Sequence, residues 1–166
     1  QESRGLGDVY KRQISNGHIS FVESRNPKMK LTKEGRGKSD IFKEMYMVSL
    51  NVNTGKVNWE KKLDTEPGIT TYFMAASKDY NVIVSSFKGN YYIYNYNAEN
   101  GDLVWEKEQS WFSDNHGGHL SRPAIVKNKL IIKPAIYKLD SGEKLKIEIP
   151  KAGHGCASYT LSEQST

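Results

Sequence analysis

The stretch MVSLNVNTGKVNWEKKL, from Met47 to Leu63, decides the fold of this 166-residue chain, because a recognisable copy of it returns further on. Its first half alternates apolar with polar residues, which is the two-residue period of a strand with one buried face. Gly55 then supplies the positive φ that a hairpin turn with a following bulge needs, and the alternation resumes on a return strand that carries Trp59. The stretch therefore predicts a β-hairpin.

A second copy, YIYNYNAENGDLVWEKE, runs from Tyr92 to Glu108. Its Gly101 stands four residues before Trp105, which is also the spacing between Gly55 and Trp59 in the first copy. The two turn glycines lie 46 residues apart. The spacing predicts a repeated structural unit, each copy of which ends in a hairpin.

A third, weaker copy lies between Ser121 and Pro150. Gly142 follows the turn glycine of the second copy after 41 residues, but its turn is shorter and Lys146 stands where the tryptophan is expected. Four short strands are predicted in this copy: Ala124–Val126, Leu130–Lys133, Ile136–Leu139 and Leu145–Ile149.

Alternating runs also precede the first two hairpins. Ile14 to Val22 contains a turn at Asn16-Gly17, after which His18 begins a strand, and further strands are predicted at Thr70–Ala76 and Tyr80–Phe87. Residues 70–108 thus read as four consecutive antiparallel strands. A period of 41 to 46 residues with four strands per repeat is typical of radial β-propellers, in which each blade packs against its neighbours.

The hairpin motif resembles the PQQ-like repeat of the quinoprotein alcohol dehydrogenase-like β-propellers, whose blades end close to Ala-x-Asp-x-x-Thr-Gly-Lys-x-x-Trp. The matching residues are Thr54, Gly55, Lys56 and Trp59 in the first copy, and Gly101 and Trp105 in the second. Asparagine replaces the aspartate in both copies, at Asn51 and Asn97, and the alanine position holds Ser49 and Asn95. In the family this tryptophan docks against the neighbouring blade, so the resemblance implies packing rather than chemistry for both tryptophans.

The resemblance implies an all-β fold: a partial β-propeller of about three four-stranded antiparallel blades. The expected blade units are 14–63, 69–108 and 121–150, with the start of a further blade at 153–166. Because such propellers have about six to eight blades, we expect a fragment of a longer protein. The family resemblance also implies a periplasmic or extracellular location.

Two segments fall outside the repeat. Residues 1–13 show no alternation, and GLGDVYKRQ resembles translated adapter sequence from environmental libraries, so we expect a processing scar. Residues 23–44 hold seven basic and four acidic residues and account for much of the formal charge of +5. Since these lysines lie in a Gly-containing loop and not among exposed aromatic residues, we expect a solvated insertion and no nucleic-acid partner.

Cysteine and hydropathy set further bounds. Cys156 is the single cysteine, which excludes an intrachain disulfide and a zinc site of several thiolates. No apolar run approaches the roughly 20 residues that span a bilayer, so no membrane-spanning segment is expected. No signal peptide is recognisable, in keeping with the expectation of a fragment.

Histidine and glycine gather in two stretches that each precede the first strand of a blade, a position near the central channel of a propeller. Candidate metal ligands there are His116, His119, His154 and Cys156, with Asp114 beside them. Imidazole and thiolate suit zinc, copper or iron, but glycine and histidine are also ordinary turn residues, so a structural turn network is the alternative. Arg122 is a candidate for binding an anionic cofactor group, or for pairing with Asp114.

These observations leave two functions open. The favoured one is a non-catalytic propeller that acts as a binding or assembly scaffold for a protein or polysaccharide. The alternative, implied by the resemblance, is a quinoprotein-type oxidoreductase that holds PQQ or a transition metal near the central channel. Whether the chain is an enzyme therefore stays open at this stage.

Overall fold

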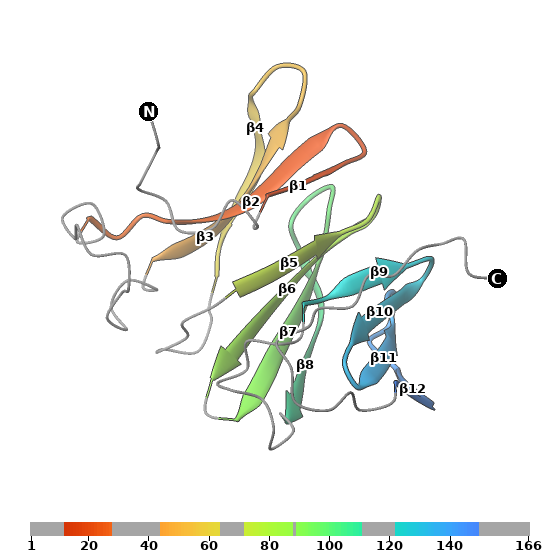
Figure 1. Ribbon diagram of the computed structural model, residues 1–166. Coiled ribbons are helices and arrows are strands. Elements are labelled where there is room, and N and C mark those ends of the chain that lie inside the picture. Colours follow the sequence, from red (N-terminus) through yellow and green to blue (C-terminus); the bar gives the residue numbers. More distant parts are fainter. Residues whose placement is uncertain (1–11, 28–43, 64–71, 88, 111–121, 150–166) are drawn as a thin grey trace, which may run out of the picture.

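The computed structural model describes residues 12–27, 44–63, 72–87, 89–110 and 122–149. In these ranges the chain forms twelve strands in three antiparallel sheets of four strands each, and no α-helix (Figure 1). Within the described part of the chain there is accordingly no helix long and apolar enough to cross a membrane. The predicted all-β fold with three four-stranded units is confirmed.

Each sheet is an up-and-down meander in which neighbours in sequence are neighbours in space. Sheet 1 has the order β1 (Arg12–Ser15), β2 (His18–Ser24), β3 (Met45–Asn51) and β4 (Val57–Lys62). Sheet 2 has the order β5 (Tyr72–Ala76), β6 (Tyr80–Phe87), β7 (Asn90–Asn97) and β8 (Leu103–Ser110). Sheet 3 contains β9 (Ala124–Val126), β10 (Lys129–Ile132), β11 (Ala135–Lys138) and β12 (Lys144–Glu148).

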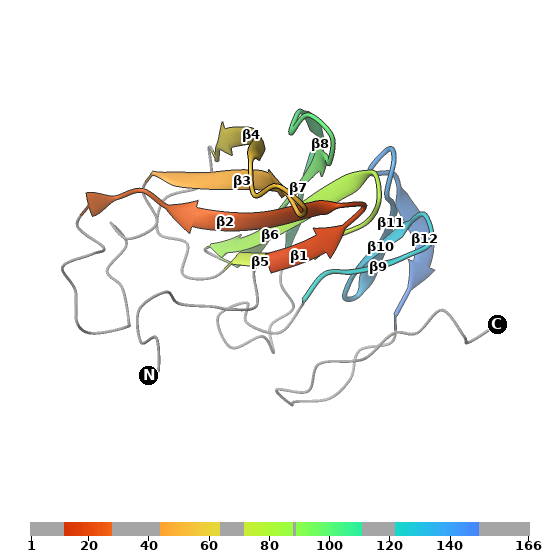
Figure 2. The same ribbon diagram turned by 90° about the horizontal axis from the view of Figure 1, so that it is seen from above.

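The first strand of each sheet lies on the inside of the assembly. Strand β5 contacts both β1 and β9, whereas β4, β8 and β12 point away from this inner row (Figure 2). The three sheets are therefore arranged as successive blades around a common side. The strands of the weak third copy lie within one residue of their predicted positions.

Two segment boundaries differ from their predicted positions. Arg12 and Gln13 pair with Phe21 and Ser20 in β1, so these two residues belong to the folded chain and not to the segment set aside as a scar. Strand β2 continues through Ser24, two residues into the predicted insertion. The origin of residues 1–11 and the solvated character of residues 28–43 stay predictions, because both segments lie outside the described residues.

The repeated tryptophan docks on the hairpin turn of the next sheet. The indole Nε1 of Trp59 donates to the carbonyl oxygen of Ala98 at 2.9 Å. A Cβ atom on Gly101 would lie 2.6 Å from Cε3 of Trp59, so the glycine, at φ +75°, gives the turn its shape and makes room for the ring. The packing role predicted for Trp59 is confirmed.

The same contact recurs one sheet further on. Trp105 Nε1 donates to the carbonyl oxygen of Leu139 at 2.8 Å, and a Cβ atom on Gly142 would lie 2.8 Å from Cδ2 of Trp105. In sheet 3, Lys146 occupies the tryptophan position and is exposed. The docking contact thus points in one direction along the chain, from each sheet to the one after it.

The hydrophobic cores lie between the sheets. Between sheets 1 and 2 the core consists of Met45, Met47, Trp59, Leu63, Met74, Ile83, Tyr94 and Tyr96. Between sheets 2 and 3 it consists of Val82, Val84, Tyr91, Ile93, Trp105, Leu130, Ile132, Ala135, Tyr137 and Leu139. Burying one such large apolar side chain contributes about 1.5–3 kcal/mol, so each sheet depends on its neighbours for stability.

Candidate binding cleft

The predicted metal ligands cannot be placed. His116, His119, His154 and Cys156 lie outside the described residues, and so does Asp114. Among the residues that the structure does describe, no group of three or more His, Cys, Asp or Glu side chains is arranged to hold a metal ion. The metal site therefore stays a prediction about the two glycine-histidine stretches.

Arg122 is the one predicted site residue that the structure describes. It is exposed, and its guanidinium carbon lies 5.9 Å from the ring centre of Phe73 on the inner strand β5. A cation over an aromatic ring at an exposed site contributes about 0.5–1 kcal/mol. A single exposed guanidinium stacked on a ring does not by itself form a cofactor site, so anion binding by Arg122 stays a prediction.

The described residues contain a cleft at the end of the molecule where the hairpin turns of sheets 1 and 2 meet, the upper end in Figure 1. Its volume is about 370 Å³. The turn β1–β2 forms one wall, and the turns β5–β6 and β7–β8 form the other. The lining residues are Asn16, His18, Lys78, Asp79, Asn97, Ala98 and Glu99.

The cleft lies at the other end of the sheets from Arg122. Phe73, which Arg122 contacts, stands near the start of β5, whereas the cleft residues Lys78 and Asp79 follow the end of that strand. The cleft is therefore a candidate site separate from Arg122.

His18 is held in one orientation at the cleft wall. Its Nδ1 lies 2.9 Å from Nδ2 of Asn58 and 3.4 Å from Oγ of Ser49. An amide NH2 group can only donate, so Nδ1 accepts, and a neutral imidazole then carries its proton on Nε2. Nε2–H is consequently the group that His18 keeps for a ligand.

The cleft lies where sheet 1 carries a shorter side chain than sheet 2 does at the corresponding position. In sheet 1, His18 pairs with Asn51; the corresponding residue of sheet 2 is Tyr80, which pairs with Asn97. Tyr80 packs against the core between sheets 2 and 3, whereas His18 is tied back to its own sheet. The space that tyrosine fills at the second interface is therefore left open at the first.

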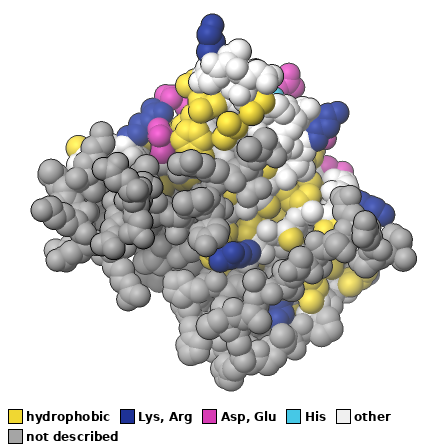
Figure 3. Space-filling view, turned by 45° about the horizontal axis from the view of Figure 1, so that its top comes forward, with side chains coloured by type: hydrophobic (Ala, Val, Ile, Leu, Met, Phe, Trp, Pro, Cys, Tyr) yellow, Lys and Arg dark blue, Asp and Glu magenta, His cyan; other side chains and the backbone are white. Residues whose placement is uncertain are grey.

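The cleft carries charges of both signs. Lys78 and Glu99 are exposed at its rim, and so is Asp79, whose backbone carbonyl accepts from Ala98 N at 2.9 Å. Asn97 Oδ1 accepts from the backbone N–H groups of Glu99 and Asn100 at 2.8 and 3.3 Å, which leaves its Nδ2 as a donor. Lysine, arginine, aspartate and glutamate side chains are interspersed on this end of the molecule (Figure 3).

A buried donor without a partner lies in the same interface. Asn81 is 2% exposed, and its Nδ2 has no hydrogen-bond partner among the described groups. Because Asn81 pairs with Tyr96, whose ring belongs to the core between sheets 1 and 2, its side chain faces sheet 1. Buried amides are normally satisfied, so an unpartnered one marks this interface as polar and incompletely filled.

The sequence contained only a faint signal for this cleft. His18 was expected merely as the first residue of a strand, and that position is confirmed. The one visible hint is that Ser49 replaces the asparagine of the second copy, Asn95. Joining that difference to His18 and Asn58 requires the strand register, which the repeat spacing does not provide.

The likeness of this fold to solved structures agrees with the repeat. Over 81% of the chain, the fold matches a europium-containing methanol dehydrogenase with a TM-score of 0.50 and 10% sequence identity. BamB from Moraxella catarrhalis matches over 92% of the chain with a TM-score of 0.45 and 14% identity. No protein-family model and no curated protein sequence matches the chain.

The chain covers 23% of the methanol dehydrogenase and 38% of BamB, so it spans well under half the length of either protein. At this level of identity the likeness concerns the fold alone. Together with the three stacked sheets and their tryptophan docking, it confirms that the chain has the predicted β-propeller fold.

Proposed function

We propose that this chain is part of a β-propeller protein that acts as a binding or assembly scaffold in the cell envelope or outside the cell. It would present the turn end of its sheets to a protein or a polysaccharide. The observation that carries the proposal is the open polar cleft of about 370 Å³ between sheets 1 and 2. The location is inferred from the resemblance of the repeat to its family.

The packing around the cleft supports such a role. Ala98 lines the cleft and at the same time accepts the indole N–H of Trp59, so the docking contact joins the two walls directly. Lys61 Nζ and Asp102 Oδ1 form an ion pair at 3.0 Å across the same interface. A cleft with fixed walls binds a ligand at a smaller cost in conformational entropy than one that must first be ordered.

Site-directed photocrosslinking tests the scaffold function. A photoreactive residue is placed at Lys78, which lines the cleft, and in a second protein at Lys107, an exposed residue on β8 that does not line it. We expect a discrete adduct, or binding to a glycan array, that depends on the cleft. A scaffold at this site is ruled out if neither adduct nor glycan binding is found, or if both positions give the same adducts.

A quinoprotein-type oxidoreductase that holds PQQ or a transition metal remains the alternative hypothesis. It rests on the resemblance and on His116, His119 and His154, which lie outside the described residues. Metal analysis of the full-length protein separates the two: bound transition metal in stoichiometric amount, lost in the variant His116→Ala/His119→Ala, would favour the oxidoreductase. Metal content that is negligible, or that this variant leaves unchanged, would count against its metal-binding form.

A further inference from the structure

We propose that the cleft between sheets 1 and 2 binds a neutral carbohydrate. The ligand hydroxyl groups would accept from His18 and Asn97 and donate to the carboxylates of Asp79 and Glu99. This inference rests on the proposed scaffold function and names the chemical class of its ligand. It is carried by the composition, size and rigidity of the cleft.

The size of the cleft suits a small polar ligand. Binding sites for small molecules have volumes of roughly 300–1,000 Å³. At about 370 Å³ the cleft lies at the lower end of that range. It therefore has room for one or two sugar rings, and its opening toward solvent would allow the rest of a chain to continue outward.

The donors of the cleft are held in place by the protein itself. Nε2–H of His18 is set by the contacts that its other ring nitrogen makes with Asn58 and Ser49, at 2.9 and 3.4 Å. Nδ2 of Asn97 is set because Oδ1 of the same amide is bound to the backbone N–H of Glu99 at 2.8 Å. A ligand hydroxyl would meet donors whose direction is already fixed.

Both acceptors belong to the sheet 2 wall of the cleft, which also carries Asn97, whereas His18 belongs to the sheet 1 wall. Asp79 and Glu99 each offer a carboxylate that can accept from two neighbouring hydroxyl groups at once. Such a site favours a ligand whose groups both donate and accept, which is the property of a polyol. An apolar ligand would leave these polar groups unpaired at a cost of about 1–3 kcal/mol for each.

The charge balance argues against an anionic ligand. Apart from His18, the lining has one ammonium group, on Lys78, and two carboxylates, on Asp79 and Glu99. An anion would meet a net negative charge, and like charges at close range oppose binding. A metal ion is equally disfavoured, since the described residues contain no suitable group of three ligands.

Calorimetric titration tests the inference. The full-length protein is titrated with neutral gluco-, galacto-, manno- and xylo-oligosaccharides, and with a uronic-acid oligosaccharide as the anionic comparison. We expect saturable binding of at least one neutral series, weakened tenfold or more in Asp79→Ala and in His18→Phe. The matched control is Glu106→Ala, which removes an exposed carboxylate of β8 outside the cleft and should leave the affinity unchanged.

The outcomes separate this inference from the scaffold function. If no neutral sugar binds, if the uronic-acid series binds better, or if Asp79→Ala binds like the control, the carbohydrate inference is wrong. A protein adduct at Lys78 in the same material would show that the scaffold function survives with a protein partner. If sugar binding and the adduct are both absent, the two proposals fail together; circular dichroism of each variant confirms that it is folded.

Discussion

The interface between sheets 1 and 2 and the interface between sheets 2 and 3 share one docking contact but differ in what surrounds it. At the second interface the carbonyl oxygen of Leu139 accepts from Trp105 at 2.8 Å and also from Asn95 Nδ2 at 2.7 Å. At the first, Ser49 stands at the asparagine position, and Trp59 is the one described side chain that donates to the carbonyl of Ala98.

Further hydrogen bonds join sheets 2 and 3 near the C-terminal end of β8. Gln109 donates to the carbonyl oxygens of Ile132 and Lys133 at 3.4 and 3.2 Å, and its own Oε1 accepts from the Tyr137 hydroxyl at 2.8 Å. The comparison teaches that the tryptophan and the glycine determine how sheets stack, whereas the residues beside them decide whether the contact closes or leaves a cleft. Three predictions test that statement, in order of decreasing effect, and a fourth concerns a part of sheet 1 that neither interface includes.

The largest effect is expected from Trp59→Ala. Removing a buried indole costs about 3–5 kcal/mol of unfolding free energy. The carbonyl of Ala98 would also lose its indole donor, whereas after Trp105→Ala the carbonyl of Leu139 keeps Asn95. We therefore expect Trp59→Ala to be the more destabilising of the two by about 1 kcal/mol in urea unfolding. Equal losses would mean that the second donor contributes nothing.

The turn glycines should differ sharply although their backbones are alike. Gly101→Ala adds a Cβ 2.6 Å from the Trp59 ring at φ +75°, so overpacking and backbone strain should together cost about 2–4 kcal/mol. Gly55→Ala is the matched control, because its φ is +68° and nothing lies within 4 Å of its Cβ position. Gly55→Ala should lower the free energy of unfolding through backbone strain alone, by about 1 kcal/mol. Similar melting temperatures for the two variants would contradict the docking role of Gly101.

Asn95→Ser should make the second interface resemble the first. The substitution removes the hydrogen bond to the Leu139 carbonyl and opens space beside Tyr80, so we expect a loss of about 1 kcal/mol. The loss is limited because Oδ1 of Asn95 has no partner among the described groups, and its removal relieves a buried unpaired acceptor. Chemical denaturation measures the change, with Asn100→Ser in the exposed part of the β7–β8 turn as the control. A variant as stable as the parent would show that the second hydrogen bond is not what closes this interface.

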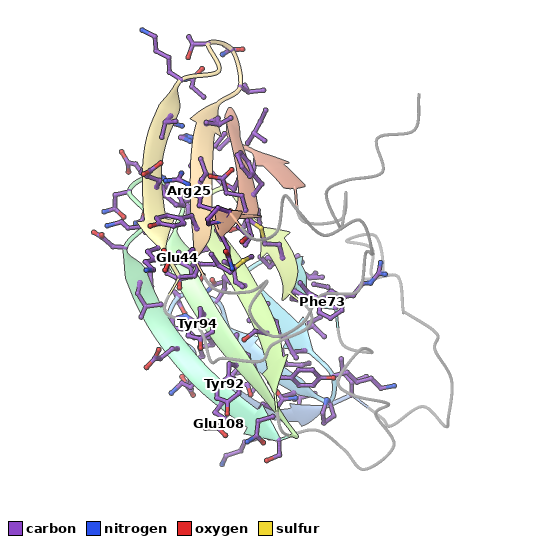
Figure 4. All side chains as sticks on the ribbon, turned by 90° about the vertical axis from the view of Figure 1, so that its left-hand side faces the viewer. Arg25, Glu44, Phe73, Tyr92, Tyr94 and Glu108 are labelled. Atoms are coloured by element: carbon purple, nitrogen blue, oxygen red, sulfur yellow. The ribbon has the colours of Figure 1, made fainter. Side chains whose placement is uncertain are left out.

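The smallest effect belongs to an exposed cluster on sheet 1, away from both interfaces. Arg25 contacts Glu60 at 2.7 Å and lies 4.2 Å from the Tyr46 ring centre, well apart from Phe73 in Figure 4. Hydrogen bonding to Arg25 lowers the pKa of Glu60 below its ordinary value. A carboxylate with a lowered pKa in the folded state adds stability above its unfolded pKa, and this is lost as the pH falls through the folded pKa.

Arg25→Gln should therefore reduce stability slightly at pH 7, and this loss should shrink as the pH falls through the lowered pKa of Glu60. Thermal unfolding over a descending pH series, at low and high salt, measures this difference. Because the pair is exposed, high salt should shrink it further. A variant effect that persists at low pH would point to the stacking on Tyr46 instead of the ion pair.

The architecture could be predicted from the sequence because it rests on local patterns. Strand alternation, turn glycines and the spacing between Gly55 and Trp59 are all contained within about a dozen residues, and the structure confirms them. The sequence also showed that Lys146 replaces the repeated tryptophan in the third copy. In the structure the Lys146 side chain is exposed, whereas the two tryptophans are buried.

The cleft could not be predicted, because its walls come from turns some 60 to 80 residues apart. His18 and Asn97 line one cavity only once Trp59 has docked on Ala98 and brought the two turns together. The glycine-histidine stretches were predicted as sites from their composition, but composition does not show which side chains lie close together in the fold. A site made of ordinary polar residues from separate turns leaves no motif in the chain.

The reach of the tryptophan contacts also affects how the chain folds. The indole hydrogen bonds of Trp59 and Trp105 close sequence separations of 39 and 34 residues. During synthesis on a ribosome, the tryptophan of one sheet can dock only after the hairpin of the next sheet has emerged. We therefore expect folding to proceed one sheet at a time, with each sheet completed after the following repeat has been synthesised. A nascent chain paused before Gly101 would hold sheet 1 with the indole of Trp59 exposed, which should favour aggregation at that stage.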